Sequence, residues 1–499
     1  MTKNHSFEPH HAEMGRHVAS GVLNNGLTQA VRVLCQFASV IVLSRLLAPA
    51  DFGLFAKVSP VFAFVSLFHG LGLNQATVQK PNLNHAEVNA FFWVNVAVGV
   101  VLTGAVCALS PVVGWYYGDP RAVPLTMAMG FLVFVGALGN QHGALLSRRM
   151  QFGRAALVGV VGAIASLAAA ILWAVFIGGY WAIYAGMTAG IVVPVIGVWI
   201  AAGWRPEWPR GAPGMRAMLK FGANITSANF SYFVANNLDN ILIGRYWGDR
   251  ELGFYDRAYK LLLFPMQRIV APLGSVLIPV LSRLHDDPER YRRAFFKTLS
   301  QLTLATWPGI LWAIVEAPVL VPALLGPRWV ATAHLFRPLA AASLLSIINS
   351  PLGWLLVSQG RARDYARWSY VSGITSVAAI ALGLPYGAYG VALGLMIVEY
   401  ARTPFQFRYV TRRGPMKAKD ILRVIAPQAT GGAVSLAALM AYQAWTGNRA
   451  HTPMGVYLIL IGGFTLSYAS TVLVTLLFPS GRETVSLTIA TARRLISGR

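Results

Sequence analysis

Four polar side chains recur along the first hydrophobic stretch of the chain at a spacing that suits ligand binding. Asn25, Gln29, Arg32 and Gln36 are separated by four, three and four residues, which places them on one face of a helix. Arg32 would offer a fixed positive charge and a planar set of donors suited to phosphate. Because an arginine inside so apolar a segment is costly without an anionic partner, we assign it to a cavity. For the three amides, an interhelical hydrogen-bond seam is an equally open interpretation.

A second polar face occurs about two hundred residues later. Four residues share it at the same spacings: Asn229, Phe233, Asn236 and Asn240. Amide donors and acceptors beside an aromatic ring suit sugar hydroxyls, and packing between helices is the alternative. Asp239 lies near the end of this segment. We assign it a structural ion pair with Arg245 or Arg257 in preference to a role in proton coupling.

Cations open the next apolar stretch. Lys260 follows Arg257 by three residues, and Lys57 precedes Arg257 by two hundred. We predict that these side chains surround the mouth of a cavity with positive charge. For Lys57 and Arg257, extension of the side chain to the lipid headgroups is equally open.

Four further polar residues stand alone in apolar runs: His69, His142, Glu316 and Glu399. We expect a neighbouring group to satisfy each of them, because buried polar groups are generally paired.

No recognised catalytic or cofactor motif accompanies these residues. The chain has no phosphate-cradling GxxxxGK[ST], no HExxH and no paired Cys or His at metal-ligand spacing. Its two cysteines, Cys35 and Cys107, fall in apolar runs, which argues against a disulfide framework. We therefore expect no cofactor, no metal site and no ATP hydrolysis by this chain, and leave open coupling to H⁺ or Na⁺.

The composition is that of a chain which lies mostly in lipid. Of 499 residues, 56% are hydrophobic and 12% are charged, whereas soluble proteins carry roughly 25% charged residues. The net charge of +23 could indicate a nucleic-acid partner. The basic residues instead gather in alternate loops, as the positive-inside rule requires of a membrane protein. This pattern excludes nucleic acid and predicts an all-α polytopic membrane protein.

The hydropathy pattern predicts about 14 membrane-spanning helices, since about 20 apolar residues cross a bilayer. We expect them to begin near residues 20, 54, 88, 124, 155 and 180, and then near residues 220, 252, 291, 333, 365, 388, 421 and 453. An even number places both termini on one side of the membrane, and the basic loops make that side cytoplasmic. The first residues do not resemble a cleaved signal peptide.

Three pairs of segments indicate an internal duplication. Residues 41–58 resemble residues 241–258, and both contain a charged turn between two apolar runs. Residues 143–154 resemble 353–364, and residues 179–187 resemble 387–395. The offsets of about two hundred residues predict two parallel six-helix lobes around a central cavity, followed by two extra helices. Chance recurrence of short Gly- and Arg-containing loops is the alternative.

The predicted organisation follows from these spans. It comprises a cytoplasmic N-terminal tail (1–19), an N-lobe (20–203), a cytoplasmic linker (204–219), a C-lobe (220–410), helices 13 and 14 (411–478), and a cytoplasmic C-terminal tail (479–499). Two parallel halves with polar groups facing between them are typical of a transporter that works by alternating access.

Four stretches resemble a known family: residues 42–58, 70–80, 236–269 and 278–297. They are similar to the Wzx-type polysaccharide transporters, the lipid-linked oligosaccharide flippases of the multidrug/oligosaccharidyl-lipid/polysaccharide exporter superfamily. The resemblance implies a non-enzymatic, multi-pass protein of the bacterial inner membrane. It also implies transfer of undecaprenyl-pyrophosphate-linked repeat units to the periplasmic leaflet for lipopolysaccharide, capsule or exopolysaccharide assembly.

Within that resemblance, the predicted site divides into two parts. Arg32, Lys260, Lys57 and Arg257 would meet the pyrophosphate, while the glycan would meet Asn25, Gln29, Gln36, Asn229, Asn236 and Asn240. Membrane lipid, a polysaccharide polymerase and chain-length machinery would be the partners.

Two other function classes are left open. A multidrug antiporter of the same superfamily would share the fold but should carry an acidic, aromatic cavity. A membrane-embedded polysaccharide polymerase or ligase should carry a large non-cytoplasmic loop with catalytic Arg or His, and the loops here are short.

Overall fold

The computed structural model describes residues 14–66, 74, 77–78, 80, 83–208, 233, 237–446 and 452–497. Within these residues the chain is helical and contains no β-strand. It divides into two compact units, Met1–Gly253 and Phe254–Arg499. The all-α prediction is therefore confirmed.

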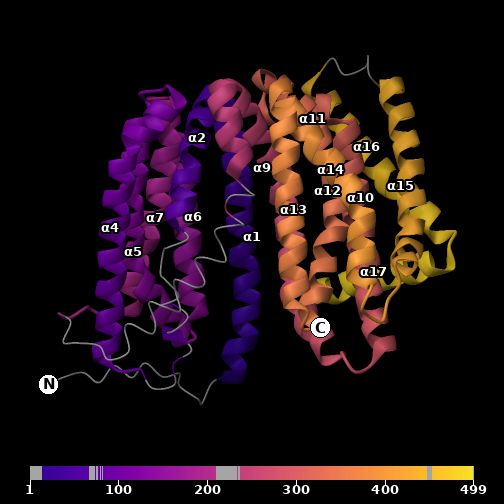
Figure 1. Ribbon diagram of the computed structural model, residues 1–499, viewed down its shortest axis with the longest axis horizontal. Helices are drawn as coiled ribbons and strands as arrows, with labels where there is room; N and C mark the ends of the chain where they lie inside the picture. The colour runs from indigo at the N-terminus through magenta and orange to yellow at the C-terminus, as the bar shows by residue number, and fades with distance from the viewer. Residues whose placement is uncertain are drawn as a thin grey trace. The chain divides into compact units, whose positions relative to one another are not determined.

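Unit 1 is built from long helices (Figure 1). They are α1 (Met14–Leu46), α2 (Pro49–Ser66), α4 (His85–Tyr117), α5 (Ala122–Arg148), α6 (Phe152–Phe176) and α7 (Trp181–Ala202). Residues 237–246 are also helical. The next helix, α9 (Gly248–Arg283), begins in unit 1 and continues into unit 2.

Unit 2 repeats this design. Its helices are α10 (Pro288–Val315), α11 (Ala317–Leu325), α12 (Val330–Ser358), α13 (Ala362–Gly383), α14 (Gly387–Thr411), α15 (Ala418–Thr446), α16 (Pro453–Leu476) and α17 (Pro479–Ser497). Short 3₁₀ turns precede α12 and α14. The segment expected to be a C-terminal tail forms α17, where Thr484 Oγ1 lies 3.3 Å from Ser300 Oγ of α10.

Local sequence sets several helix ends. Asn84 caps α4 by accepting a hydrogen bond from the backbone of Glu87, whose side chain returns to Asn84. The same helix ends at Gly118, whose φ of 63° suits glycine. Asp287 caps α10 just before a proline, a residue that needs no hydrogen-bond acceptor in the first turn.

Ten stretches of the described residues are long and apolar enough to cross a membrane. One of them, Ala362–Thr411, contains both α13 and α14. The helix expected to begin near residue 220 lies largely outside the described residues. The chain is a multi-pass membrane protein, and the total of fourteen spans stays a prediction, as do the lobe boundaries.

Close helix contacts in unit 2 depend on glycine. A Cβ atom on Gly383 would lie 2.4 Å from the carbonyl oxygen of Gly390, and a Cβ on Gly390 would lie 2.3 Å from that of Gly383. Side chains at either position would push apart α13 and α14, because small residues are what allow backbones in a membrane to meet. A Cβ on Gly373, also in α13, would meet nothing within 4 Å among the described residues.

We therefore expect Gly390→Val to lower the thermal unfolding temperature of the detergent-solubilised protein by several degrees, because the added side chain overlaps backbone that has no room to move. Gly373→Ala is the matched control and should leave the temperature unchanged or raise it slightly. Equal unfolding temperatures for Gly390→Val and the wild type would contradict the packing described here.

Candidate functional site

The predicted residues of α1 lie on an exposed face. Gln29, Arg32 and Gln36 are all exposed, and the Arg32 guanidinium reaches α6, where a Cβ on Gly159 would lie 3.3 Å from Nη1. No carboxylate among the described residues pairs with Arg32. The side chain of Asn25 lies outside the described residues. Arg32 is thus a cation that an anionic ligand could approach, and its role stays a prediction.

The cations of α9 share one buried acid. Lys260 Nζ lies 2.7 Å from Oδ1 of Asp256, and Arg257 Nη2 lies 3.4 Å from Oδ2. Asp256 is 5% exposed and Arg257 is 7% exposed, whereas the Lys260 side chain is 44% exposed. The Lys260 side chain is therefore the partly exposed member of this cluster. Arg257 is buried, so the prediction that it lies at an open cavity mouth does not hold in this structure.

Asp256 is a residue that the sequence reasoning missed. Its signal is the spacing of four between Asp256 and Lys260, which places an acid and a base on neighbouring turns of one helix. The acid reduces the net positive charge that we expected from Arg257 and Lys260 in this part of α9.

Lys57 is also buried. It therefore neither lies at an open cavity mouth nor extends to the lipid headgroups, the two alternatives that the sequence left open. It is 4% exposed, forms an ion pair with Asp249, and places Nζ 5.4 Å from the ring centroid of Tyr117. Arg121 Nη2 lies 2.7 Å from Asp249 and 2.8 Å from Asp119. The four charged groups link α2, the turn between α4 and α5, and the first turn of α9.

This network holds the Asp119 carboxyl in its ionised form. Hydrogen bonds from the Arg121 side chain keep the pKa of Asp119 below its ordinary value of 3.8. A carboxyl with a lowered pKa contributes stability that is present above its ordinary pKa and is lost as the pH falls through the lowered value. The network is therefore intact at neutral pH.

Beside the network, the two copies of the repeated turn contact each other reciprocally. A Cβ on Gly53 would lie 1.7 Å from the carbonyl oxygen of Asp249, and a Cβ on Gly253 would lie 1.9 Å from that of Pro49. The two contacts are equivalent, because Pro49 and Asp249 are two hundred residues apart, as are Gly53 and Gly253. All four residues belong to unit 1. Local twofold symmetry of this kind is what a duplicated segment produces when its copies pack together.

Of the second polar face, only part is described. Asp239 is 6% exposed and its Oδ1 accepts a hydrogen bond of 2.8 Å from the backbone nitrogen of Asn240. Asn240 is half-buried. Asn229 and Asn236 lie outside the described residues, so the proposed glycan face stays a prediction.

The isolated polar residues differ from one another. Glu399 is satisfied as expected: it accepts hydrogen bonds from Ser346 Oγ at 3.1 Å and Asn349 Nδ2 at 2.7 Å, and pairs with Arg402. Glu316 is fully buried, yet neither carboxyl oxygen has a hydrogen-bond partner among the described residues. Among the described residues, the expectation was therefore wrong for Glu316. His69 lies outside the described residues.

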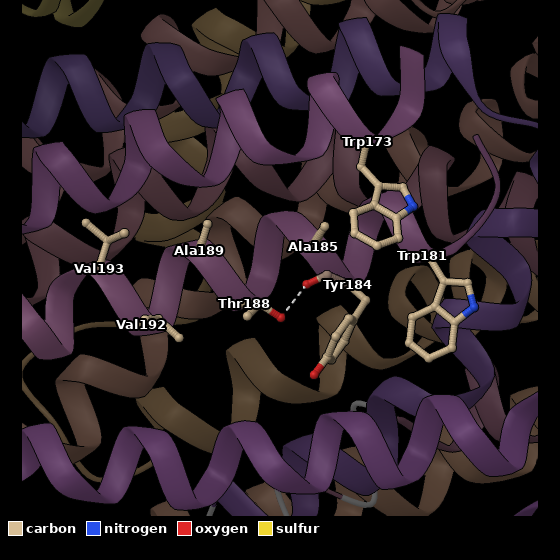
Figure 2. Close-up of a pocket in the computed structure, with 8 residues that line it drawn as sticks. All are labelled: Trp173, Trp181, Tyr184, Ala185, Thr188, Ala189, Val192 and Val193. Atoms are coloured by element: carbon tan, nitrogen blue, oxygen red, sulfur yellow. Dashed lines mark hydrogen bonds between the residues drawn. The ribbon is translucent and has the colours of Figure 1, made fainter. Parts of the chain in front are cut away.

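A cavity of about 570 Å³ lies between α6 and α7 (Figure 2). Trp173, Trp181 and Tyr184 form its aromatic end. The hydroxyl of Thr188, the other oxygen-bearing side chain of the wall, donates to the backbone oxygen of Tyr184 at 2.9 Å. With its hydroxyl already paired, the wall suits an apolar chain rather than a sugar.

Comparisons with known proteins agree with the fold and indicate a family. Residues 42–334 match the model of a family described as "Polysaccharide biosynthesis protein". The chain is 24% identical over 391 residues to the lipopolysaccharide biosynthesis protein WzxC of Escherichia coli (strain K12), covering 77% of this chain and 79% of the relative. It is also 24% identical over 385 residues to the succinoglycan biosynthesis transport protein ExoT of Rhizobium meliloti (strain 1021), covering 76% of each.

A solved structure shares the architecture. The lipid II flippase MurJ in its inward closed conformation superimposes with a TM-score of 0.73 at 11% identity, covering 91% of this chain and 98% of the other. At so low an identity the likeness concerns the fold alone. It confirms the predicted class of helical transporter fold.

The buried ion pair between Lys57 and Asp249 allows a test of what holds the turns of unit 1 together. Asp249→Asn leaves Lys57 buried without its anion, which should lower the free energy of unfolding by about 3–5 kcal/mol. The readout is the unfolding midpoint in detergent. Adding Lys57→Met should recover part of the loss, since the unpaired charge is then removed.

Asp287→Asn is the matched control for this pair. Asp287 lies 3.2 Å from Arg290, and the side chains are 44% and 74% exposed. Exposed pairs contribute roughly 0–1 kcal/mol, and asparagine caps a helix as well as aspartate does. If Asp249→Asn were no more destabilising than this control, the network would not hold the turns together.

Proposed function

The chain belongs to the polysaccharide biosynthesis protein family, and from that membership we propose that it is a flippase for undecaprenyl-pyrophosphate-linked oligosaccharide repeat units. It moves them from the cytoplasmic to the periplasmic leaflet of a bacterial inner membrane for surface or exopolysaccharide assembly. It acts as a transporter and not as an enzyme. The observation that carries the proposal is the similarity, over three quarters of both chains, to a relative named as a succinoglycan biosynthesis transport protein.

Two accessible cations support the choice of an anionic substrate. Arg32 is exposed on α1, and the Lys260 side chain is 44% exposed on α9. Either side chain suits a phosphate group: arginine binds it through paired donors and lysine as a point charge. Lys260 is paired with Asp256 but is partly exposed, whereas Lys57 and Arg257 are both buried and paired with carboxylates. If either of them meets substrate, it must do so in a conformation in which that pair is broken.

Alternating access supplies such a conformation. In a transporter of this kind, one end of the protein must close while the other opens. The reciprocal glycine contacts and the Lys57–Asp249 pair form a compact closure in unit 1. We propose that this closure separates when the substrate is released. No cofactor takes part, and a gradient of H⁺ or Na⁺ is the candidate energy source.

The orientation that we propose places both termini in the cytoplasm. The turn at Arg361 and the segment from Arg408 to Arg423 then face the cytoplasm, because they carry the densest basic charge. A polysaccharide polymerase and chain-length machinery are the proposed partners on the opposite side.

Cysteine labelling tests this orientation. In a Cys35→Ala/Cys107→Ala background, we expect Arg328→Cys to react with a membrane-impermeant maleimide added to intact spheroplasts. Arg413→Cys should react only after the membrane is opened. Both arginines are exposed in turns between helices, so the topology and not burial decides the result. The reverse pattern would overturn the orientation.

The function itself is tested by leaflet transfer in proteoliposomes that hold undecaprenyl-pyrophosphate-linked oligosaccharide from the native pathway. We expect Arg32→Ala and Lys260→Ala each to slow transfer by about tenfold, since a hydrogen bond to a charged group contributes about 1.5–3 kcal/mol. Arg423→Ala, at an exposed arginine of α15, is the matched control and should transfer normally.

The outcomes separate the function from the site. Normal transfer by both variants would retain the flippase and remove these cations from it. Absence of transfer by the wild type under H⁺ and Na⁺ gradients would contradict the flippase and favour the multidrug antiporter.

A further inference from the structure

A second groove, of about 630 Å³, lies between α13 and α14 in unit 2. It involves the helix pair that corresponds to α6 and α7, since these are the fifth and sixth helices of each predicted repeat, but it lies toward the opposite end of that pair. The two differ in charge. The wall between α6 and α7 has no charged residue, whereas the second groove includes Arg402, Arg408 and Arg412.

The three arginines are not equally available. Arg402 pairs with Glu399 and donates to the backbone oxygen of Ser372 at 3.1 Å. Arg412 Nη2 lies 3.0 Å from Asp364, and its guanidinium lies 4.1 Å from the ring centroid of Tyr409. Arg408 is exposed and makes no hydrogen bond or ion pair with any described residue. One end of the groove therefore carries the charge of Arg408, unpaired among the described residues, and the charge of Arg412, which is paired with Asp364.

Along α14, the charged groups and the apolar residues are ordered as the headgroup and the acyl chains of a lipid are ordered in a leaflet. α14 ends at Thr411, so Arg408 lies about 5 Å from its end at 1.5 Å per residue. Phe405, Ala401 and Val398 follow at increasing depth, opposite Val371 of α13. The cationic end thus lies at the membrane face that carries the basic segments, and the apolar wall runs inward from it.

We propose that this groove binds one anionic phospholipid, with its phosphate on Arg408 and Arg412 and an acyl chain along Phe405 and Val371. Phosphate is the anion that matches the planar donors of arginine, and a membrane supplies it on an acyl chain. A single phosphate fits better than a diphosphate, because only Arg408 is free of an internal acid. Neither Arg32 nor Lys260 lines this groove.

Lipid retention tests the proposal with the full-length protein. The protein is reconstituted in nanodiscs of equal parts phosphatidylglycerol and phosphatidylcholine and extracted in mild detergent. Native mass spectrometry then counts the lipids that stay bound. We expect the wild type to retain phosphatidylglycerol about fivefold over phosphatidylcholine, the preference that one basic residue gives near an anionic membrane surface.

Three variants locate the effect. Arg408→Gln should abolish the preference, while Arg408→Lys should keep most of it because the charge remains. Ala401→Trp should reduce retention of both lipids, since the indole fills the acyl-chain part of the groove. Arg423→Gln, at an exposed arginine outside the groove, is the control and should behave as the wild type does.

Other results would overturn the proposal. An unchanged preference in Arg408→Gln, or an equal loss in Arg423→Gln, would show that general surface charge selects the lipid. Retention of added undecaprenyl pyrophosphate but not of phosphatidylglycerol would assign the groove to the transported substrate instead. Because the readout is bound lipid, failure of the flippase proposal would leave these results interpretable.

Discussion

The packing of the repeated turns in unit 1 depends on a positive charge that has almost no exposed surface. Lys57 is 4% exposed, and burial of an ammonium group is unfavourable unless an anion accompanies it. Asp249 supplies that anion and also receives Arg121. One carboxylate thus fixes the positions of α2, the turn between α4 and α5, and the start of α9.

Glycine makes this ion pair geometrically possible. Gly53 precedes Lys57 by four residues, so both lie on the same face of α2. Because a Cβ on Gly53 would overlap the carbonyl of Asp249, only glycine lets α2 approach close enough for the lysine to reach its partner. The contact combines backbone packing with one ion-pair network. Under the alternating access that we propose, a contact of so few parts separates as a unit.

Much of the helical architecture could be predicted from the sequence, because it depends on local properties. The predicted start at residue 453 coincides with the start of α16, where Thr452 caps the helix before Pro453. The predicted starts at residues 88 and 291 lie three residues from those of α4 and α10. The offset of two hundred between Gly53 and Gly253 also pointed to two residues that meet in the structure.

The partners of the polar residues were decided only by the tertiary structure. Lys57 and Asp249 are 192 residues apart. Helical periodicity relates residues within one helix, so it does not reveal an ion pair between segments so distant. The sequence showed that Lys57 and Glu316 are ionisable residues in apolar stretches. It did not show that Lys57 is paired, whereas the Glu316 carboxyl has no partner among the described residues. Hydropathy and spacing act within a helix and therefore determine which segments are helical. Charge pairing acts between helices, so it depends on which faces the packing brings together.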